Sequence, residues 1–436
     1  MKKITYLALF LFVGTQTFAQ SVEQVISKDY VERLIKTLSS DDMQGRATFT
    51  PGIDKAAKFI ESEFKSIGLK PLTGESGFRQ SFSKVQLKPV EANVTINGKV
   101  VDPAAVMVYG NTSETLSFDQ SSNTPIVNFD ASKAFMAQFR ALSRNGKKQI
   151  VIVPLALAED FKRIKVRFDQ GSIVDQKDIS TDPNLTVFIL NESTAVTNYK
   201  IALKNTVLNM PLFNVAGMIP GKSKTKEIVV FSGHYDHLGV IKAVEQDSIA
   251  NGADDDASGI TGMISLAKYY KKLNNNERTL IFVAFTAEEI GGYGSQYFSS
   301  KLNPDDVVAM FNIEMIGKDS KFGQNTAYIT GFDKSDFGTI LQKNLKGTEF
   351  TFHPDPYPSQ NLFYRSDNAT LAALGVPAHT ISTVQIDGDK LYHTVKDEFS
   401  SLDVNNILST IRGIAKSAIS IVKGIDTPTR IPKLSN

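Results

Sequence analysis

From residue 207 onward, apolar runs of the strand type alternate with helical patterns, and this alternation constrains the fold more than any other feature of the chain. Four runs have the length and composition of buried strands: 227–232, 279–285, 307–313 and 376–381. Apolar residues recur at helical spacing in 260–270 and over a long amphipathic stretch, 404–425. Continuous apolar strands separated by helices are typical of a parallel sheet covered on both faces. The sequence therefore predicts an α/β fold with a mainly parallel (mixed) central sheet flanked by helices.

The middle of the chain has a different character. Residues 22–70 are predicted to be mostly helical, whereas short β-like runs bounded by turn residues such as Asn97-Gly98 follow them. The clearest of these runs are 92–96, 150–153 and 185–190. Short strands with turn signals between them favour a separate β-rich module. We expect a discontinuous main domain, 20–85 and 207–436, interrupted by a β-rich module at 86–206.

The N-terminus has the layout of a secretory signal peptide. Lys2 and Lys3 precede an apolar run at 4–13, and Thr17-Phe18-Ala19 offers small residues at the positions that a signal peptidase reads. The run is too short to span a bilayer stably, although an N-terminal membrane anchor is the alternative. We expect residues 1–19 to be removed by cleavage near Ala19. The mature protein would then be periplasmic or secreted and would not associate with the membrane.

Composition excludes several classes of site. The chain has no cysteine, so that neither a disulfide nor a thiolate metal site is possible. The formal net charge is +2, and both Lys residues of the predicted signal peptide contribute to it. No basic stripe of the kind that binds a phosphate backbone is visible, and we expect no nucleic-acid partner.

Histidine and acidic residues occur where the predicted strands end or helices begin. Ligands of such sheets bind at the carboxyl ends of the strands. His234 and Asp236 follow the run at 227–232, Glu288 and Glu289 follow 279–285, and Glu314 follows 307–313. Two further positions lie in loops, namely the run Asp254-Asp255-Asp256 before a helix and a late histidine, His393. Their joint placement predicts a polar site at one edge of the sheet.

Each group taken alone has an ordinary explanation. Three aspartates can cap a helix, and adjacent glutamates usually lie on a solvated surface. His234 and His237 could bind one metal together, although Asp236 between them fits better as a residue that supports a ligating histidine. Taken together, imidazoles and carboxylates favour zinc, because an all-oxygen set would favour magnesium or calcium.

Five segments, in this order along the chain, resemble the M28 family of zinc peptidases, which includes bacterial aminopeptidases. They are Gly233-His234-Tyr235-Asp236-His237-Leu238-Gly239, the segment 251–259, Ala287-Glu288-Glu289-Ile290-Gly291, the segment 312–317 and Tyr392-His393-Thr394. The segment Asp42-Met43-Gln44-Gly45-Arg46 is similar to the opening of the family. The resemblance covers 22–85 and 207–425. Many relatives carry an inserted protease-associated domain, and 86–206 would be a diverged version.

The resemblance implies two zinc ions bridged by Asp255. His234, Asp255 and Glu314 would bind one ion, and Asp255, Glu289 and His393 would bind the other. A bridging carboxylate places two metal ions roughly 3.5–4 Å apart. The expected cofactor is therefore Zn²⁺, two per chain.

Some positions depart from the family pattern or have no role in it. The family more often has Asp where this chain has Glu314, and often has His where this chain has Asn368. Tyr364, in the same loop as Asn368, is a candidate substrate contact. His353 and His379 match no ligand position, and we expect both to be structural.

By the same resemblance, Glu288 would be the general base of an exopeptidase, and Asp236 would orient His234. The leading hypothesis is an aminopeptidase with peptide substrates. A carboxypeptidase or a dipeptidase of the same fold is the main alternative, because specificity lies in loops that the motifs do not include. Glutaminyl cyclisation and a binding module without catalysis are two further hypotheses. The complete ligand set and the retained Glu288 argue against both of them.

Overall fold

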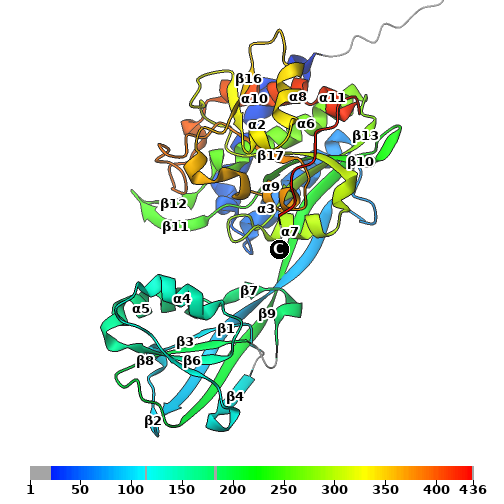
Figure 1. The fold of residues 1–436 in the computed structure, drawn as a ribbon. Helices are drawn as coiled ribbons and strands as arrows, with labels where there is room; N and C mark the ends of the chain where they lie inside the picture. The colour runs from blue at the N-terminus through cyan, green and yellow to red at the C-terminus, as the bar shows by residue number, and fades with distance from the viewer. Residues whose placement is uncertain (1–20, 113–114, 181–183, 435–436) are drawn as a thin grey trace, which may run out of the picture. The chain divides into compact units, whose positions relative to one another are not determined.

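The computed structural model describes residues 21–112, 115–180 and 184–434, which form two compact units (Figure 1). Unit 1 contains the described parts of Met1–Gln80 and Phe213–Asn436, and unit 2 is Ser81–Leu212. The predicted signal peptide, residues 1–19, lies outside the described residues. Within the described ranges, no helix combines the length and the apolarity needed to cross a membrane.

A mixed sheet forms the centre of unit 1. Its strands, in spatial order, are β16 (Thr351–Pro354), β15 (Thr326–Ile329), β17 (Ala378–Ser382), β14 (Val307–Ile313), β10 (Lys224–His234), β13 (Arg278–Phe285) and the end of β9 (Tyr199–Ile219). The pairs β13–β10, β10–β14 and β14–β17 are parallel. β9 joins β13, and β15 joins β17, in antiparallel pairs. The predicted mainly parallel, mixed sheet is confirmed.

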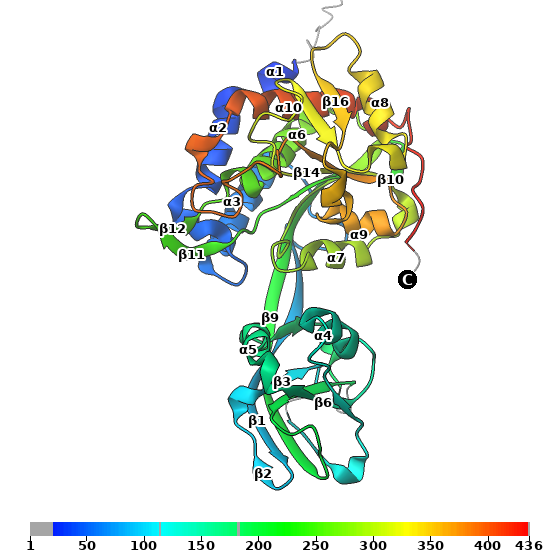
Figure 2. The same ribbon diagram turned by 60° about the vertical axis from the view of Figure 1, so that its left-hand side comes forward.

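Helices cover both faces of this sheet. One face packs against α1 (Val22–Val25), α2 (Lys28–Leu38), α3 (Pro51–Ile67), α6 (Gly259–Leu273), α8 (Phe337–Asn344) and α10 (Val404–Ser417), and the other against α7 (Tyr293–Ser300) and α9 (Asn368–Ala373). Figure 2 shows α7 and α9 on the opposite side of β10 from α2, α3 and α6. Along β13, Leu280 and Phe282 pack on the first face and Ile281 and Val283 on the second. Both faces of a strand are therefore apolar, which explains the continuous apolar runs.

The predicted helix over 404–425 is interrupted in the structure. α10 ends at Ser417, and α11 (Ile419–Val422) follows after Ala418. The side chain of Asn344 donates hydrogen bonds to the carbonyl oxygen of Ser417 (2.6 Å) and to the hydroxyl of Ser420 (2.7 Å). A partner from another helix thus satisfies the carbonyl at the break. The apolar periodicity continues through the break, and for this reason the sequence does not reveal it.

Unit 2 contains more helix than the β-rich pattern predicts. Its four-stranded sheet has the order β3 (Val106–Tyr109), β8 (Thr186–Asn191), β6 (Gln149–Pro154) and β5 (Ile126–Asn128). Long stretches of β1 (Arg79–Ile96) and β9 pair with the short strands β2 (Lys99–Val100), β4 (Thr115–Asp119) and β7 (Ser172–Val174). Two helices, α4 (Phe135–Ser143) and α5 (Ala158–Asp169), pack aromatic residues against the four-stranded sheet. The unit is therefore a mixed α/β module.

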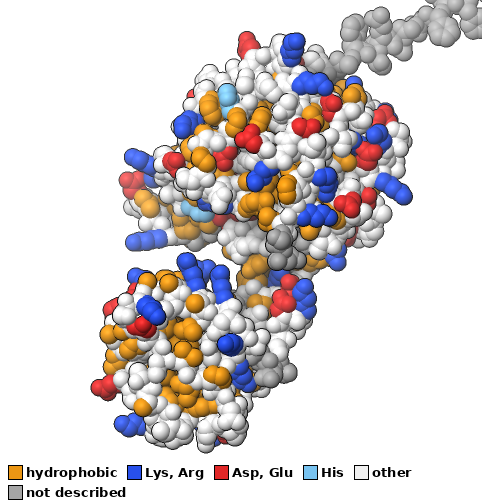
Figure 3. All heavy atoms as spheres, viewed as in Figure 1, with side chains coloured by type: hydrophobic (Ala, Val, Ile, Leu, Met, Phe, Trp, Pro, Cys, Tyr) orange, Lys and Arg blue, Asp and Glu red, His pale blue; other side chains and the backbone are white. Residues whose placement is uncertain are grey.

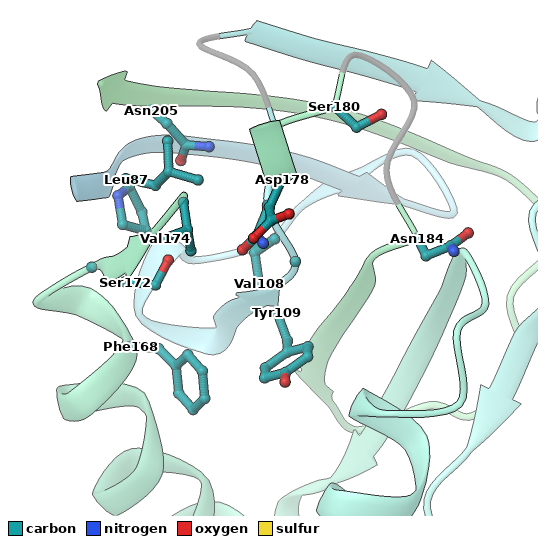
Figure 4. Close-up of a pocket in the computed structure, with 14 residues that line it drawn as sticks. Leu87, Val108, Tyr109, Phe168, Ser172, Val174, Asp178, Ser180, Asn184 and Asn205 are labelled. Carbon is teal, nitrogen blue, oxygen red and sulfur yellow. The ribbon is translucent and has the colours of Figure 1, made fainter. Parts of the chain in front are cut away.

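A pocket of about 620 Å³ lies within unit 2 (Figure 4). Tyr109 and Phe168 lie at one end of it and Asn205 at another. Its described lining holds one acidic side chain, Asp178, and no histidine. The chemistry predicted from the sequence therefore cannot come from this pocket.

On the face of unit 1 drawn in Figure 3, positive and negative side chains are interspersed.

His379, on β17, lies in the interior of the sheet, and its burial makes the stability of the protein depend on pH. Its ring is fully buried and stacks on Phe337, with Nδ1 2.9 Å from the carbonyl oxygen of Thr330 and Nε2 2.8 Å from the hydroxyl of Ser335. Burial lowers the pKa of His379 to about 4, from 6.5 in an unfolded chain. Between these values the unfolded chain binds a proton that the folded protein does not, so that stability falls as the pH falls.

Relative to a His379→Gln variant, the wild-type protein should lose about 2 kcal/mol of unfolding free energy between pH 7.5 and pH 5. Comparison with the variant isolates this one group from the other carboxylates and histidines. The measurement is urea unfolding of both proteins across this pH range. Parallel stability curves would contradict the assignment.

Candidate metal centre

The polar side chains meet because three neighbouring strands are parallel. His234 ends β10, Glu288 and Glu289 follow β13, and Glu314 follows β14 directly. β10 lies between the other two strands, so that their carboxyl ends lie at one edge of the sheet. His393 reaches the same place from the loop between β17 and α10. The structure therefore brings together residues from four separate segments of the chain.

Asp255 comes from a tight loop between β12 (Asp247–Ala250) and α6. The loop begins at Gly252, whose φ is +56°, and a Cβ there would lie 2.2 Å from the carbonyl oxygen of Asp255. It would also lie 2.6 Å from ring atoms of His237. This close approach requires glycine and explains the Asn251-Gly252 pair in the sequence.

The three consecutive aspartates have three different environments. Asp256 accepts hydrogen bonds from the backbone N–H groups of His234, Gly259 and Met315, each at 3.1 Å. It therefore both caps α6 and ties the helix to two strand ends. Asp254 forms an ion pair with Lys318 at 3.2 Å. The capping explanation thus holds for Asp256, and the middle aspartate is directed toward the histidines.

The carboxylate of Asp255 lies at the centre of the cluster. Its Oδ1 is 3.1 Å from Nε2 of His234, and its Oδ2 is 3.2 Å from Nε2 of His393. Glu289 Oε2 is 3.2 Å from the same atom of His393. Donor atoms of His234, Asp255 and Glu314 all lie within 4.8 Å of one another. This is the spacing that ligands of one metal ion would have.

His237 also belongs to the cluster, although its sequence motif indicates no firm role for it. Its Nδ1 lies 2.8 Å from Oε1 of Glu289 and 3.8 Å from Oδ2 of Asp255. His237, Asp255 and Glu289 thus form a second group whose donor atoms lie within 4.8 Å of one another. His234 and His237 therefore lie in different groups, and the pairing of both on one metal finds no support in this geometry.

Several buried donor atoms of the cluster have no hydrogen-bond partner. They are Nε2 of His234, of His237 and of His393, and Oε2 of Glu314. Unsatisfied buried polar atoms are costly, and metal ions commonly account for them. Burial lowers the pKa of His393, but Asp255 and Glu289 raise it more strongly, to about 10. The cluster therefore favours positive charge, and its mixed nitrogen and oxygen donors fit zinc.

Asp236 supports the cluster in two ways. Its carboxylate accepts the backbone N–H groups of Glu288 (3.1 Å) and Glu289 (3.3 Å) and the hydroxyl of Thr48 (3.1 Å). His234 Nδ1 lies 3.1 Å from the main-chain carbonyl oxygen of Asp236 and 4.0 Å from its carboxylate. The main chain of Asp236 therefore orients His234, and its side chain positions the two glutamates.

A small pocket opens beside the cluster. Its volume is about 70 Å³, and its lining includes the acidic residues Asp255, Glu288 and Glu314. Burial raises the pKa of Glu288 well above its usual range, and the neighbouring carboxylates of Glu314 and Asp367 raise it further. The lining also contains six apolar or aromatic residues, Met315, Tyr328, Leu362, Val384, Ile386 and Tyr392, and four hydroxyl residues, Thr330, Ser366, Thr380 and Ser382. Arg365 is the one cationic side chain among the described lining residues.

Two residues of the nearby loop are engaged in packing. The ring of Tyr364 lies 4.7 Å from that of Phe363 and packs against the second apolar cluster of unit 1, and Tyr364 does not line the pocket. Asn368 is fully buried, donates to the carbonyl oxygens of Phe363 (2.9 Å) and Ala378 (3.1 Å) and accepts from Thr380 (2.9 Å). Asn368 therefore has a structural role in this chain. Tyr392 lines the pocket instead, with its ring stacked 3.8 Å from that of His393.

Sequence reasoning also missed Arg46. This guanidinium is 1 % exposed and donates to the main-chain carbonyl oxygens of Leu38 (2.7 Å), Tyr235 (2.9 Å), Asn251 (2.6 Å) and Gly252 (3.0 Å). It thereby joins the loop after β10 to the loop that carries Asp255. The only sequence signal was its place in the segment Asp42-Met43-Gln44-Gly45-Arg46, which identifies no partner.

Residues 214–418 match the family model described as Peptidase family M28. Leucine aminopeptidase 1 of Ajellomyces capsulatus (strain H88) is 28% identical over 211 residues, which is 45% of this chain and 52% of that protein. The protein named probable zinc metalloprotease of Leptosphaeria maculans is 33% identical over 106 residues, or 24% of each chain. This chain therefore spans about half the length of the first of these relatives and a quarter of the second.

Among solved structures, the aminopeptidase from Aneurinibacillus sp. strain AM-1 has a similar fold, with a TM-score of 0.53 and 18% identity. The match covers 95% of this chain and 98% of that one. Residues 214–418, which contain the five motifs, therefore place this part of the chain in peptidase family M28, as the resemblance of the motifs predicts.

Replacement of Arg46 tests whether it holds the two loops together. Arg46→Met leaves buried carbonyl oxygens without donors, and we expect it to lower the unfolding free energy by about 3–5 kcal/mol. Arg33→Met is the control, because Arg33 is half-exposed and its surface pair with Glu63 should contribute less than about 1 kcal/mol. Urea unfolding measures both. Equal losses in the two variants would show that Arg46 has no special structural role.

Proposed function

We propose that unit 1 is a zinc-dependent exopeptidase that uses two zinc ions and acts as an aminopeptidase on peptides. One observation carries this proposal. Asp255 lies between two sets of side chains that could hold a metal, His234 with Glu314 and His393 with Glu289, and the first set borders a pocket that Glu288 also lines. Such an arrangement can bind two ions through one bridging carboxylate and place a base next to them. The names of the leucine aminopeptidase and zinc metalloprotease relatives agree with it.

His234, Asp255 and Glu314 would hold one ion, and Asp255, Glu289 and His393 the other. When bound, zinc lowers the pKa of a water molecule and polarises a carbonyl group. Glu288 accepts the proton of the attacking water and donates it to the departing amine. Asp236 holds the backbone of Glu288 in place for this transfer. The pocket side chains exclude water and surround the first side chain of the peptide.

The surplus of carboxylates beside the pocket favours a free amino group in the substrate. Arg365, in contrast, is an exposed cation in the same lining and favours a carboxylate, as a carboxypeptidase or a dipeptidase would require. Hydrolysis of free-amine peptides compared with N-acetylated peptides separates the two functions. Preferred cleavage of the acetylated peptides would support the carboxypeptidase.

We also propose that the protein is exported, because residues 1–19 have the layout of a signal peptide. N-terminal sequencing of the mature protein from the native host would test this. A mature chain beginning at Gln20 agrees with the proposal, and a retained Met1 contradicts it.

Glu288→Gln tests the assignment of the base. The variant keeps the shape of the side chain and loses the proton acceptor, and we expect kcat on leucine p-nitroanilide to fall about 10²–10⁴-fold. Zinc content should be unchanged, since Glu288 is not among the proposed ligands. Glu245→Gln is the control, because Glu245 is an exposed residue of the β11 (Gly239–Val244) to β12 turn. Near-normal turnover in the Glu288 variant would exclude this mechanism.

Removal of the metal should abolish hydrolysis and destabilise the folded protein. A ligand present at about 1,000 times its dissociation constant stabilises by about 4 kcal/mol, and chelation removes this contribution. Metal analysis should give two zinc ions per chain, and zinc should restore the activity of the chelated protein. One tightly held zinc per chain would favour a glutaminyl cyclase, and no metal would favour a binding module.

A further inference from the structure

His237 lies where it can distinguish two adjacent glutamates. Glu288 and Glu289 follow one another after β13, and the proposed function requires one to bind metal and the other to move protons. Of the two, Glu289 has a histidine on each of its carboxylate oxygens, with Oε1 2.8 Å from His237 and Oε2 3.2 Å from His393. Among the described residues, no such pair of histidines meets Glu288, which lines the pocket.

We propose that His237 is a positioning residue, which donates the hydrogen of its Nδ1 to Oε1 of Glu289 and so directs Oε2 to the second zinc ion. This inference rests on the proposed function, because it concerns a ligand of the proposed second site. Ligating carboxylates are commonly held by a hydrogen bond to the oxygen that does not bind the metal, and loss of such a partner weakens metal binding.

The ring of His237 is itself held firmly. His237 is 2 % exposed, and its backbone N–H donates to the carbonyl oxygen of Arg46 at 3.3 Å. The ring lies close to Gly252, where a Cβ would be 2.6 Å from Cγ and Cδ2 of His237. Arg46 in turn donates to the carbonyl oxygen of Gly252. The donor that meets Glu289 is therefore fixed before any metal binds.

The distances favour positioning over direct ligation. The 2.8 Å separation between Nδ1 and Oε1 is that of a charge-assisted hydrogen bond. Oδ2 of Asp255 is 3.8 Å from Nδ1 of His237, whereas it is 3.2 Å from Nε2 of His393. His393 therefore lies closer than His237 to Asp255, the carboxylate that both ions would share, whereas the close partner of His237 is Glu289.

Three substitutions distinguish a hydrogen-bond donor from a ligand. His237→Asn keeps an N–H at the position of Nδ1–H, His237→Gln places its amide farther out, and His237→Leu removes the donor. We expect the affinity of the second zinc ion to fall about 10–100-fold in the Leu variant, and to stay within about threefold of wild type in the Asn variant. The Gln variant should bind more weakly than the Asn variant. Zinc competition with a chromophoric chelator, starting from metal-free full-length protein, measures both sites.

The outcomes separate the inference from the proposed function. Equal weakening in the Asn and Leu variants would mean that His237 is itself a ligand, and unchanged affinity in the Leu variant would mean that it has no role; either overturns the inference. If the wild-type chain binds fewer than two zinc ions, the proposed function fails, and with it the site that His237 would serve. Near-ultraviolet circular dichroism of the metal-free variants checks folding.

A double variant keeps the test decisive if His237→Leu is unstable. Glu289→Gln should cause a loss of affinity by itself, and His237→Gln, which weakens binding in the wild-type background, should add almost nothing when combined with it, because both act through one hydrogen bond. Losses that multiply would show that His237 acts independently of Glu289 and would overturn the inference.

Discussion

The buried guanidinium of Arg46 is the interaction on which the site depends. Four carbonyl oxygens, from α2's last residue, the loop after β10 and the loop before α6, accept its hydrogen bonds. Burial lowers the pKa of Arg46, while the carboxylates of Asp255 and Asp397 raise it. A single cation therefore satisfies the main chain of two loops and partly offsets the negative charge of the cluster.

Around Arg46, one set of carboxylates accepts hydrogen bonds from backbone N–H groups. These carboxylates surround a second set, the proposed metal ligands. Asp236 positions the two glutamates after β13, and Asp256 joins three segments through their N–H groups. Asp397, from the loop after His393, accepts the N–H groups of Asp254 (3.0 Å) and Asp255 (3.0 Å). Each of these hydrogen bonds fixes the backbone beside a proposed ligand and so restricts the conformations of that ligand's side chain. A site whose ligands lie on loops can in this way become as rigid as one on strands.

The fold followed from local patterns where those patterns are strong. The run 307–313 coincides with β14, and the run 279–285 differs from β13 by one residue, because continuous apolar stretches bounded by polar residues have few other ways to fold. The break at Ala418 and the helices of unit 2 were missed. The first depends on Asn344, a residue far away in the sequence. The second left a signal that the prediction did not use, because Phe135 and Phe139, and Phe161 and Phe168, recur at helical spacing.

For the site, the sequence alone determined which residue types stand at strand ends, and the family resemblance assigned roles to His234, Asp255, Glu288, Glu289, Glu314 and His393. Parallel pairing of β13, β10 and β14 is a property of the sheet, so only the tertiary structure decided that these side chains meet. It also placed Tyr364 and Asn368 in packing roles and set His237 against Glu289. Local sequence cannot encode such outcomes, because each depends on the distance between two segments that are far apart along the chain.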